Sequence, residues 1–357
     1  MSGDRPPDPK VDVSVLIPVL NEIEQIEETA GRMRGQDFEG EIEFLFIDGG
    51  SSDGTRELID ELAHADGRVR RLDNPASHIP AALNIGLRHA AGRYVARMDA
   101  HTHYPPDYLQ RGVRRLDRGG VAWVSGPALP FGTDRWSRRV ELALSTWLGV
   151  GSAGFRRPAQ EEFESDTGFT GVWYRETLRR HDGWDEASLV NEDAELAARV
   201  RQAGERIVCV PEMAARYVPR NSLPALARQY WRYGTYRART SGLHPQSLRR
   251  SNLLPPALAL ALTAALVAPR PVARVARAAL VAYLVAIGGA SFGAAKRAPL
   301  GDVARLPLVF FAMHFPWGFG FLAGSLRFGP PYAAVAQALG FPLRVHNSDH
   351  PGSEKGK

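Results

Sequence analysis

Three potential metal ligands follow a strand-like segment near residue 97. In "RMDAHTHY", Asp99, His101 and His103 occupy every second position directly after a short apolar run. Alternate side chains of an extended chain point to the same side. The spacing therefore predicts that Asp99 and His101 bind one divalent ion, and it leaves open whether His103 is a third ligand or a structural histidine.

Acidic side chains also follow two earlier strand-like segments. The first segment ends in "PVLNE", and the second ends in "IDGGSSDGT", which contains Asp48 and Asp53. In open parallel sheets, ligands bind at the carboxyl ends of the strands, so we expect these side chains and Asp99 to surround one pocket. The alternative for Asp48 is that it only stabilises a turn.

Strand-like and helix-like patterns alternate over the first 100 residues. Apolar runs at 13–20, 42–50, 69–74 and 94–100 are separated by helical patterns at 21–33, 51–65 and 79–92. Such alternation is typical of parallel strands with helices on both faces of the sheet. The sequence therefore predicts an α/β fold.

A further acidic pair lies in "NEDAELAARVRQAG", which has the pattern of a helix beginning near Asn191. Free N–H groups and the helix dipole at such a start favour an ionised carboxylate. An ionised Asp193 would suit the removal of a proton from a hydroxyl group. The alternative is that Glu192 and Asp193 only cap the helix.

Arginines are concentrated on the helical pattern that follows. Gln229, Arg232, Arg237 and Arg239 lie there, and Arg232 and Arg239, seven residues apart, share a helix face. They could bind a diphosphate or form a basic belt beside a membrane. The formal charge of +5 suits anionic lipids or polyanionic substrates. No nucleic-acid-binding motif accompanies it, so no nucleic-acid partner is expected.

Three uncharged apolar stretches follow residue 250. They span residues 253–268, 278–295 and 306–326, and a membrane helix needs about 20 apolar residues. Two or three of them are predicted to associate with a membrane, and the first could lie in the interface instead of crossing. Basic residues flank every stretch, so the positive-inside rule selects no topology.

These patterns divide the chain into four parts. We expect a disordered lead over 1–10, an α/β domain over 11–250, membrane-associated helices over 251–328 and a polar tail over 329–357. The single cysteine, Cys209, excludes an internal disulfide framework and a cysteine-based zinc site. It lies in "RIVCVP" and is predicted to be a buried strand residue.

Five segments, in order, resemble the family 2 glycosyltransferases, and within them the succinoglycan-biosynthesis type of glucosyltransferase. They are "VSVLIPVLNE", "FIDGGSSDGT", "ALNIGLRHAAGRYVARMDAH", "GWDEASLVNEDAELAARVRQAG" and "RQYWRYG". The resemblance covers roughly residues 11 to 240. It implies an inverting enzyme with the nucleotide-sugar-binding GT-A fold, which is a Rossmann-like mixed sheet covered by helices on both faces.

The resemblance also implies roles for individual residues. The nucleotide-sugar pocket would comprise Pro18, Asn21, Glu22, Asp48, Asp53, Asn84 and Asp99, with Arg88 beside it. Asp193 would be the catalytic base, and Gln229 and Arg232 would contact the acceptor or the diphosphate.

Two positions depart from the family pattern. His101 replaces the last aspartate of the metal-binding DxD motif, and Tyr233 replaces the tryptophan of QxxRW. An imidazole ligand favours Mn²⁺, whereas Mg²⁺ prefers oxygen ligands. The expected cofactor is Mn²⁺ or Mg²⁺, which would bind the donor's diphosphate.

The leading prediction is a membrane-bound glycosyltransferase at the cytoplasmic face. It would transfer a sugar from a nucleotide-diphosphate donor, expected to be a UDP-sugar, to a lipid-linked or cell-envelope polysaccharide acceptor. A nucleotidyltransferase would need a glycine-rich basic loop after the first strand, which "PVLNEIEQIEE" lacks. A non-catalytic nucleotide-sugar-binding membrane subunit is the remaining alternative.

Overall fold

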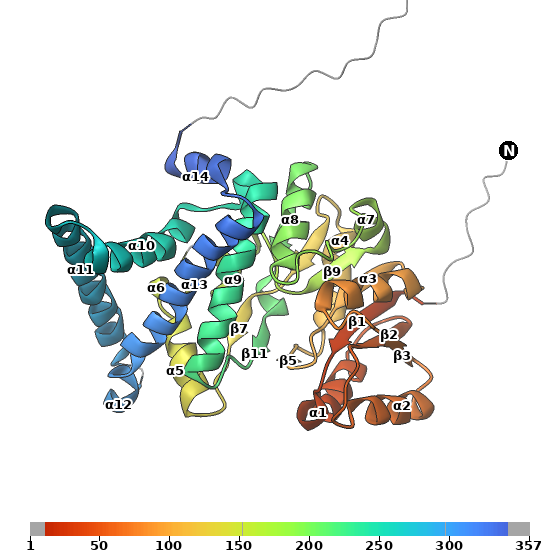
Figure 1. Cartoon of the computed structure of the whole chain (residues 1–357). Helices are drawn as coiled ribbons and strands as arrows, with labels where there is room; N and C mark the ends of the chain where they lie inside the picture. Colours follow the sequence, from red (N-terminus) through yellow and green to blue (C-terminus); the bar gives the residue numbers. More distant parts are fainter. Residues whose placement is uncertain (1–10, 152, 297, 342–357) are drawn as a thin grey trace, which may run out of the picture.

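The computed structural model describes residues 11–151, 153–296 and 298–341 (Figure 1). The expectations for the lead over 1–10 and for residues 342–357 of the tail lie outside these ranges. An α/β part contains most of the strands, and a group of long helices lies beside it.

The main sheet has the order β3-β2-β1-β4-β9-β6-β10-β8. Its strands are β1 (Val13–Val19), β2 (Ile42–Asp48), β3 (Val69–Asp73), β4 (Tyr94–Arg97), β6 (Trp123–Ser125), β8 (Phe163–Glu164), β9 (Gly171–Tyr174) and β10 (Ile207–Cys209). Strands β1 to β4 are parallel, as the alternating pattern predicts, whereas β9 runs antiparallel to both β4 and β6. The sheet is therefore mixed, as in the GT-A fold.

Helices cover both faces of the sheet. One apolar core joins Val13, Val15 and Ile17 of β1 to α1 (Ile23–Arg34), α2 (Thr55–Ala65) and α4 (Tyr108–Asp117). The opposite core joins Leu16 to α3 (Ile79–His89), α7 (Arg175–Arg180) and α8 (Glu192–Gln202). Successive side chains of a strand point to opposite faces, so the apolar residues of β1 contribute to both cores. Cys209 is buried in β10, as predicted.

The chain enters a small second sheet directly after the "DAH" segment. It has the order β5-β11-β7, formed by β5 (Thr102–His103), β11 (Ala215–Tyr217) and β7 (Ala128–Pro130). Strand β4 ends at Arg97, and the Thr102 N–H donates to the Asp99 carbonyl across a turn. The expectation that Asp99, His101 and His103 alternate along one extended strand is therefore wrong.

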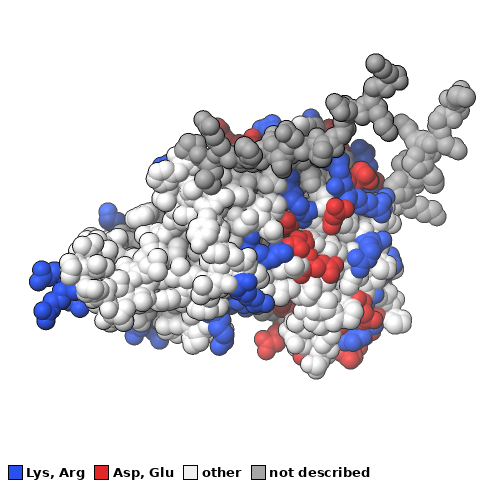
Figure 2. All heavy atoms as spheres, turned by 45° about the horizontal axis from the view of Figure 1, so that its top comes forward, with Lys and Arg blue, Asp and Glu red and all other residues white. Residues whose placement is uncertain are grey.

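The remaining helices form the second part of the molecule. They are α5 (Arg135–Leu144), α6 (Trp147–Val150), α9 (Leu223–Leu243), α10 (Leu254–Val267), α11 (Arg270–Ala294), α12 (Leu300–Val303), α13 (Leu306–Phe328) and α14 (Tyr332–Leu339), with 3₁₀ turns η1 (Gly154–Arg156), η2 (Pro211–Met213), η3 (Pro245–Ser247) and η4 (Arg250–Leu253). Among the described residues, three of these helical segments are long and apolar enough to cross a membrane. Figure 2 shows that the visible face of this end of the molecule is mostly uncharged, with basic residues at its far tip and along its margins.

Glycines allow α13 to pack directly on α9 and α10. A Cβ atom at Gly320 would lie 2.2 Å from the Trp231 carbonyl oxygen of α9, and one at Gly324 would lie 2.3 Å from that of Thr235. A Cβ atom at Gly234 of α9 would lie 2.0 Å from the Trp317 carbonyl oxygen. Small residues let helix backbones approach closely in this way. Helix α9, which precedes the predicted boundary at residue 250, is therefore packed along a helix that follows it.

We predict that Gly320→Ala destabilises the protein, because the added methyl group would meet backbone atoms that cannot rotate away. Overpacking of this kind costs about 1–3 kcal/mol. Gly288→Ala on α11 is the matched control, since its Cβ would meet nothing within 4 Å and alanine is the better helix former. Thermal unfolding in detergent should show a lower Tm for Gly320→Ala only. Equal Tm values for the two variants would contradict the close packing.

Candidate functional site

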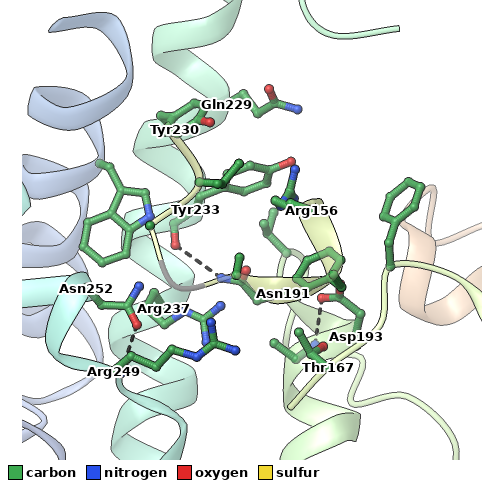
Figure 3. Close-up of a pocket in the computed structure, with 18 of the residues that line it drawn as sticks. Arg156, Thr167, Asn191, Asp193, Gln229, Tyr230, Tyr233, Arg237, Arg249 and Asn252 are labelled. Carbon is green, nitrogen blue, oxygen red and sulfur yellow. Dashed lines mark hydrogen bonds between the residues drawn. The ribbon is translucent and has the colours of Figure 1, made fainter. Parts of the chain in front are cut away.

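A cavity of about 1130 Å³ lies between the main sheet and the C-terminal helices. Its lining includes Asp99, His101, Asp193, Gln229 and Arg232. These residues come from the end of β4, the start of α8 and the middle of α9, so the fold brings together positions up to 133 residues apart. Figure 3 shows Asp193 and Gln229 on the wall of this cavity.

Asp193 lies in the first turn of α8. Asn191 adopts a left-handed conformation (φ 64°) before the helix, and its side-chain amide donates to the Tyr233 carbonyl of α9 (3.2 Å). The Asp193 carboxylate accepts the Ala194 N–H (2.7 Å). The helix start was expected to favour the ionised form. Burial instead raises the pKa of Asp193, although the nearby charges of Arg97, Arg237 and Arg156 oppose the increase.

Arg97 connects the metal-binding motif to the acidic pair. Its guanidinium is buried, and it donates to Asp99 Oδ1 (Nε, 2.8 Å) and to Glu192 Oε1 (Nη1, 2.9 Å). One cation thus fixes Asp99 and the residue that precedes Asp193. The sequence reasoning missed Arg97, although a charged residue at the end of the apolar strand "YVAR" was the available signal.

The two histidines of the motif have different surroundings. His101 Nδ1 lies 3.5 Å from Glu22 Oε1, and the interaction with Glu22 raises the pKa of the His101 imidazole. His103 contacts the Arg32 side chain of α1, and its ring packs edge-on to Phe131. These contacts favour the structural alternative for His103.

Asp99 and His101 do not form a complete ion site on their own. Within the described ranges, no group of three or more histidine, cysteine, aspartate or glutamate side chains could hold a metal ion. Both carboxylate oxygens of Asp99 are bound by Arg97, at 2.8 and 3.3 Å. Any ion at this place would need further ligands from a bound substrate.

The loops after β1 and β2 form a second cluster of predicted residues. The Asn21 N–H donates to Ser51 Oγ (2.9 Å), and the Ile23 N–H donates to Asp53 Oδ2 (3.1 Å), so the two loops are tied together. The Thr55 hydroxyl donates to Asp53 and lowers the pKa of that carboxylate. Pro18 lies on β1, and Glu22 reaches His101. Apart from His101, none of these residues lines the large cavity.

Two of the residues predicted to bind the nucleotide already have hydrogen-bond partners within the protein. The buried Asp48 accepts the backbone N–H groups of Gly50 and Ser51, which is the turn-stabilising role considered above. The Asn84 amide donates to the Trp184 carbonyl (2.7 Å) and accepts the Trp184 N–H (2.9 Å). Their contacts with a nucleotide stay predictions.

The arginines of α9 that line the cavity are not the pair that the spacing suggested. Arg239 pairs with Asp185 Oδ2 (2.6 Å) and also donates to Ser188, and it does not line the cavity. Arg232 and Arg237 do line it, so the suggestion that Arg232 and Arg239 bind one diphosphate together is wrong. Arg156 was missed by the sequence reasoning, and it donates to the Tyr217 hydroxyl (3.0 Å) beside Tyr230 and Tyr233.

The cavity is lined by both cationic and apolar side chains. The cationic residues include Arg156, Arg220, Arg228, Arg232 and Arg237. The apolar residues come in part from α6, α10 and α13 and include Leu148, Leu254, Pro255, Met313 and Trp317. In Figure 3, Arg156 and Arg237 extend from different elements towards the space beside Asp193. The cavity can therefore receive a ligand that has both an anionic and an apolar part.

Comparisons with known proteins agree with the fold and the motifs. Residues 14–176 match the family described as Glycosyl transferase family 2. The chain is 31% identical to the succinoglycan biosynthesis protein ExoA of Rhizobium meliloti (strain 1021) over 327 residues, which are 88% of this chain and 95% of that protein. It is 24% identical over 231 residues to a dolichyl N-acetyl-alpha-D-glucosaminyl phosphate 3-beta-D-2,3-diacetamido-2,3-dideoxy-beta-D-glucuronosyltransferase of Methanococcus voltae, covering 62% and 71% of the two chains.

A solved structure shows the same architecture. S. aureus TarS, residues 1–349 in complex with UDP, matches 89% of this chain and 92% of its own, with a TM-score of 0.51 and 14% identity. At this identity the likeness shows the fold alone. The family match and the long similarity to ExoA go further, and they decide against a nucleotidyltransferase. The chain is an enzyme of glycosyltransferase family 2.

Proposed function

We propose that this enzyme transfers a sugar, with inversion, from a nucleotide-diphosphate donor to a hydroxyl group of a lipid-linked acceptor at the cytoplasmic face of a membrane. The observation that carries the proposal is the cavity lined by both arginines and apolar side chains, with Asp193 in its lining. A lipid-linked sugar has an anionic phosphate or diphosphate beside an apolar chain, so it matches both kinds of lining residue. The Methanococcus voltae relative is named for a dolichyl phosphate substrate, which supports this class of acceptor.

Asp193 is proposed to act as the base. Inversion requires that the acceptor oxygen attack the sugar carbon from the face opposite the leaving diphosphate, and a base must remove the hydroxyl proton. Burial raises the pKa of Asp193, and a higher pKa makes a carboxylate a stronger base. Arg97, through Glu192 and Asp99, would hold the base and the donor-side carboxylate in fixed positions.

The donor is proposed to bind where the loops after β1 and β2 meet the end of β4. Pro18, Asn21, Glu22, Asp48, Asp53 and Asn84 are the expected contacts, with Asp99 at the boundary with the cavity. The contact between Glu22 and His101 supports this arrangement, because it joins the donor loops to the cavity. A uridine nucleotide is proposed from the family resemblance.

Asp99 and His101 fit a divalent ion that binds together with the donor. One carboxylate and one imidazole leave most of the coordination to diphosphate oxygens. When bound, such an ion would neutralise charge on the leaving diphosphate. The mixed ligand pair favours Mn²⁺ over Mg²⁺.

We expect Arg237→Gln to weaken binding of the acceptor and to leave binding of the donor unchanged. Hydrogen bonds to charged groups contribute about 1.5–3 kcal/mol, so the KM for a lipid-linked acceptor should rise about 10- to 100-fold. The assay uses full-length enzyme in detergent with a panel of nucleotide sugars. Lipid-linked and soluble oligosaccharide acceptors are compared. Arg118→Gln, an exposed arginine after α4, is the control. Equal use of both acceptor classes by the wild type would contradict the lipid-linked assignment.

Asp193→Asn should reduce transfer by a factor of roughly 10² to 10⁴ while donor binding persists, because the amide keeps the shape and loses the base. The wild-type rate should fall as acid protonates Asp193. Since burial raises this pKa, the loss should occur above the pH of about 3.9 at which an ordinary aspartate titrates. Transfer rates across pH and donor binding by calorimetry test both statements. Near-normal turnover of Asp193→Asn would remove Asp193 as the base.

A chelator should abolish donor binding and turnover, and Mn²⁺ should restore both better than Mg²⁺. His101→Asp creates an all-oxygen pair and should shift the preference towards Mg²⁺. Asp99→Ala should lose metal-dependent binding altogether. Calorimetric titration of UDP, with either ion, measures these effects without relying on activity. If His101→Asp keeps the wild-type ranking of the two ions, His101 is not a ligand.

A further inference from the structure

Hydropathy alone would make α13 a third membrane crossing. The segments 250–267, 270–294 and 300–328 each pass the length and hydropathy expected of a span. Within an 18-residue apolar window of each segment, the shares of residues buried inside the protein differ, at 22%, 22% and 50%. If all three crossed, the two ends of α13 would lie on opposite sides of the membrane. The contacts at its ends exclude that arrangement.

The beginning of α13 is attached to the catalytic part through α12. Asp302 of α12 pairs with Arg139 of α5, with 2.7 Å between Arg139 Nε and Asp302 Oδ1. The Arg139 side chain is buried, and its guanidinium lies 4.6 Å from the centre of the Trp136 ring. Helix α5 follows β7 directly, and its Glu141 accepts the Gly132 N–H (2.8 Å). Residue 302 therefore lies on the same side as the second sheet.

The end of α13 is attached to the catalytic part as well. Arg250, just before α10, donates to the Ala338 carbonyl of α14 (2.9 Å). Ala334 and Ala338 are buried in a cluster with Ala238 of α9 and Leu248. Helix α14 thus lies against α9 and against the segment that precedes the first apolar helix (Figure 1).

Between these two attachments, α13 lies along α9. Gly320 of α13 lies against the backbone of Trp231 in α9, and Gly324 lies against that of Thr235. Another face of α9 lines the cavity through Arg232, Tyr233 and Arg237. A position of α13 across the bilayer would carry these arginines into hydrocarbon, where unpaired charges are strongly disfavoured.

We propose that α13 does not cross the membrane and that the hairpin of α10 and α11 is the part that inserts into lipid. The side chains of this hairpin are largely exposed and apolar, with 77% exposure for Leu266, 70% for Val285 and 80% for Phe292. The first turns of α11 carry Arg270, Arg274 and Arg277, and these charges would lie at the polar surface of the bilayer and not in hydrocarbon. The chain before α10 and the chain after α11 then lie on one side. This arrangement holds whatever donor and acceptor the enzyme uses.

Single-cysteine labelling tests the arrangement in the full-length protein. Cys209 should not react with the label, because it is buried and burial raises the pKa of its thiol to about 12. Exposed reporters are introduced as Gln25→Cys in α1, Ala304→Cys before α13 and Gln337→Cys in α14. Intact and permeabilised cells are treated with a membrane-impermeant maleimide. All three reporters should label in the same condition, and opposite sidedness of residues 304 and 337 would overturn the proposal.

A fourth reporter tests the lipid contact of the hairpin. Phe292→Cys, on the exposed face of α11, should label in neither condition while the protein is in the membrane and should label after detergent extraction. Labelling of residue 292 from the aqueous phase in membranes would refute the insertion of the hairpin. Retention of each variant in the membrane fraction shows whether the reporters have left the protein attached.

A charge swap tests the attachment of α12 independently of labelling. Arg139→Asp and Asp302→Arg should each lower the Tm, and the double variant should recover most of the loss because the pair is restored with reversed charges. The coupling is measured by thermal unfolding of all four proteins in detergent. Additive losses in the double variant would mean that α12 does not lie on α5. The proposed position of α13 would then fail.

Discussion

The close contact of α9 with α13 is the constraint on which the rest of the second half depends. Glycine at positions 234, 320 and 324 removes the side chains that would otherwise separate the two backbones. The contact fixes the position of α9, which brings Gln229, Arg232 and Arg237 to the cavity. The same contact gives α13 a partner that is neither lipid nor water. Helix α13, which has the hydropathy of a membrane anchor, therefore helps to form the site.

Buried charge organises the other side of the cavity. Arg97 is held between Asp99 and Glu192, so the end of β4 and the start of α8 cannot move independently. Removing one partner of such a group would leave an uncompensated charge in a poorly solvated place. Asp99 and the first turn of α8, which carries the proposed base Asp193, are consequently parts of one electrostatic unit. This unit and the arginines of α9 and η1 line the same cavity.

The arrangement connects membrane attachment to substrate choice. The hairpin of α10 and α11 presents apolar side chains outward, while Leu254 and Pro255 of α10 also line the cavity. An acceptor with a lipid chain could thus remain in contact with apolar surface as its phosphate meets the arginines. The donor loops lie at the opposite side of His101. The proposed donor and acceptor would then meet beside Asp193.

The sequence by itself determined the local structure and the membership of the family. The positions of β1 to β4 and of α1 to α3 follow from apolar periodicity, because backbone geometry fixes which neighbours share a face. The five motifs in order identified the family, and the apolar stretches after residue 250 became α10, α11 and α13. Side-chain partners distant in the chain were decided only by the tertiary structure. Periodicity carries no information on the pairing of Arg97 with Glu192, 95 positions away, or of Arg239 with Asp185, 54 positions away. For the same reason, hydropathy could not distinguish a helix that faces lipid from α13, whose apolar face meets another helix.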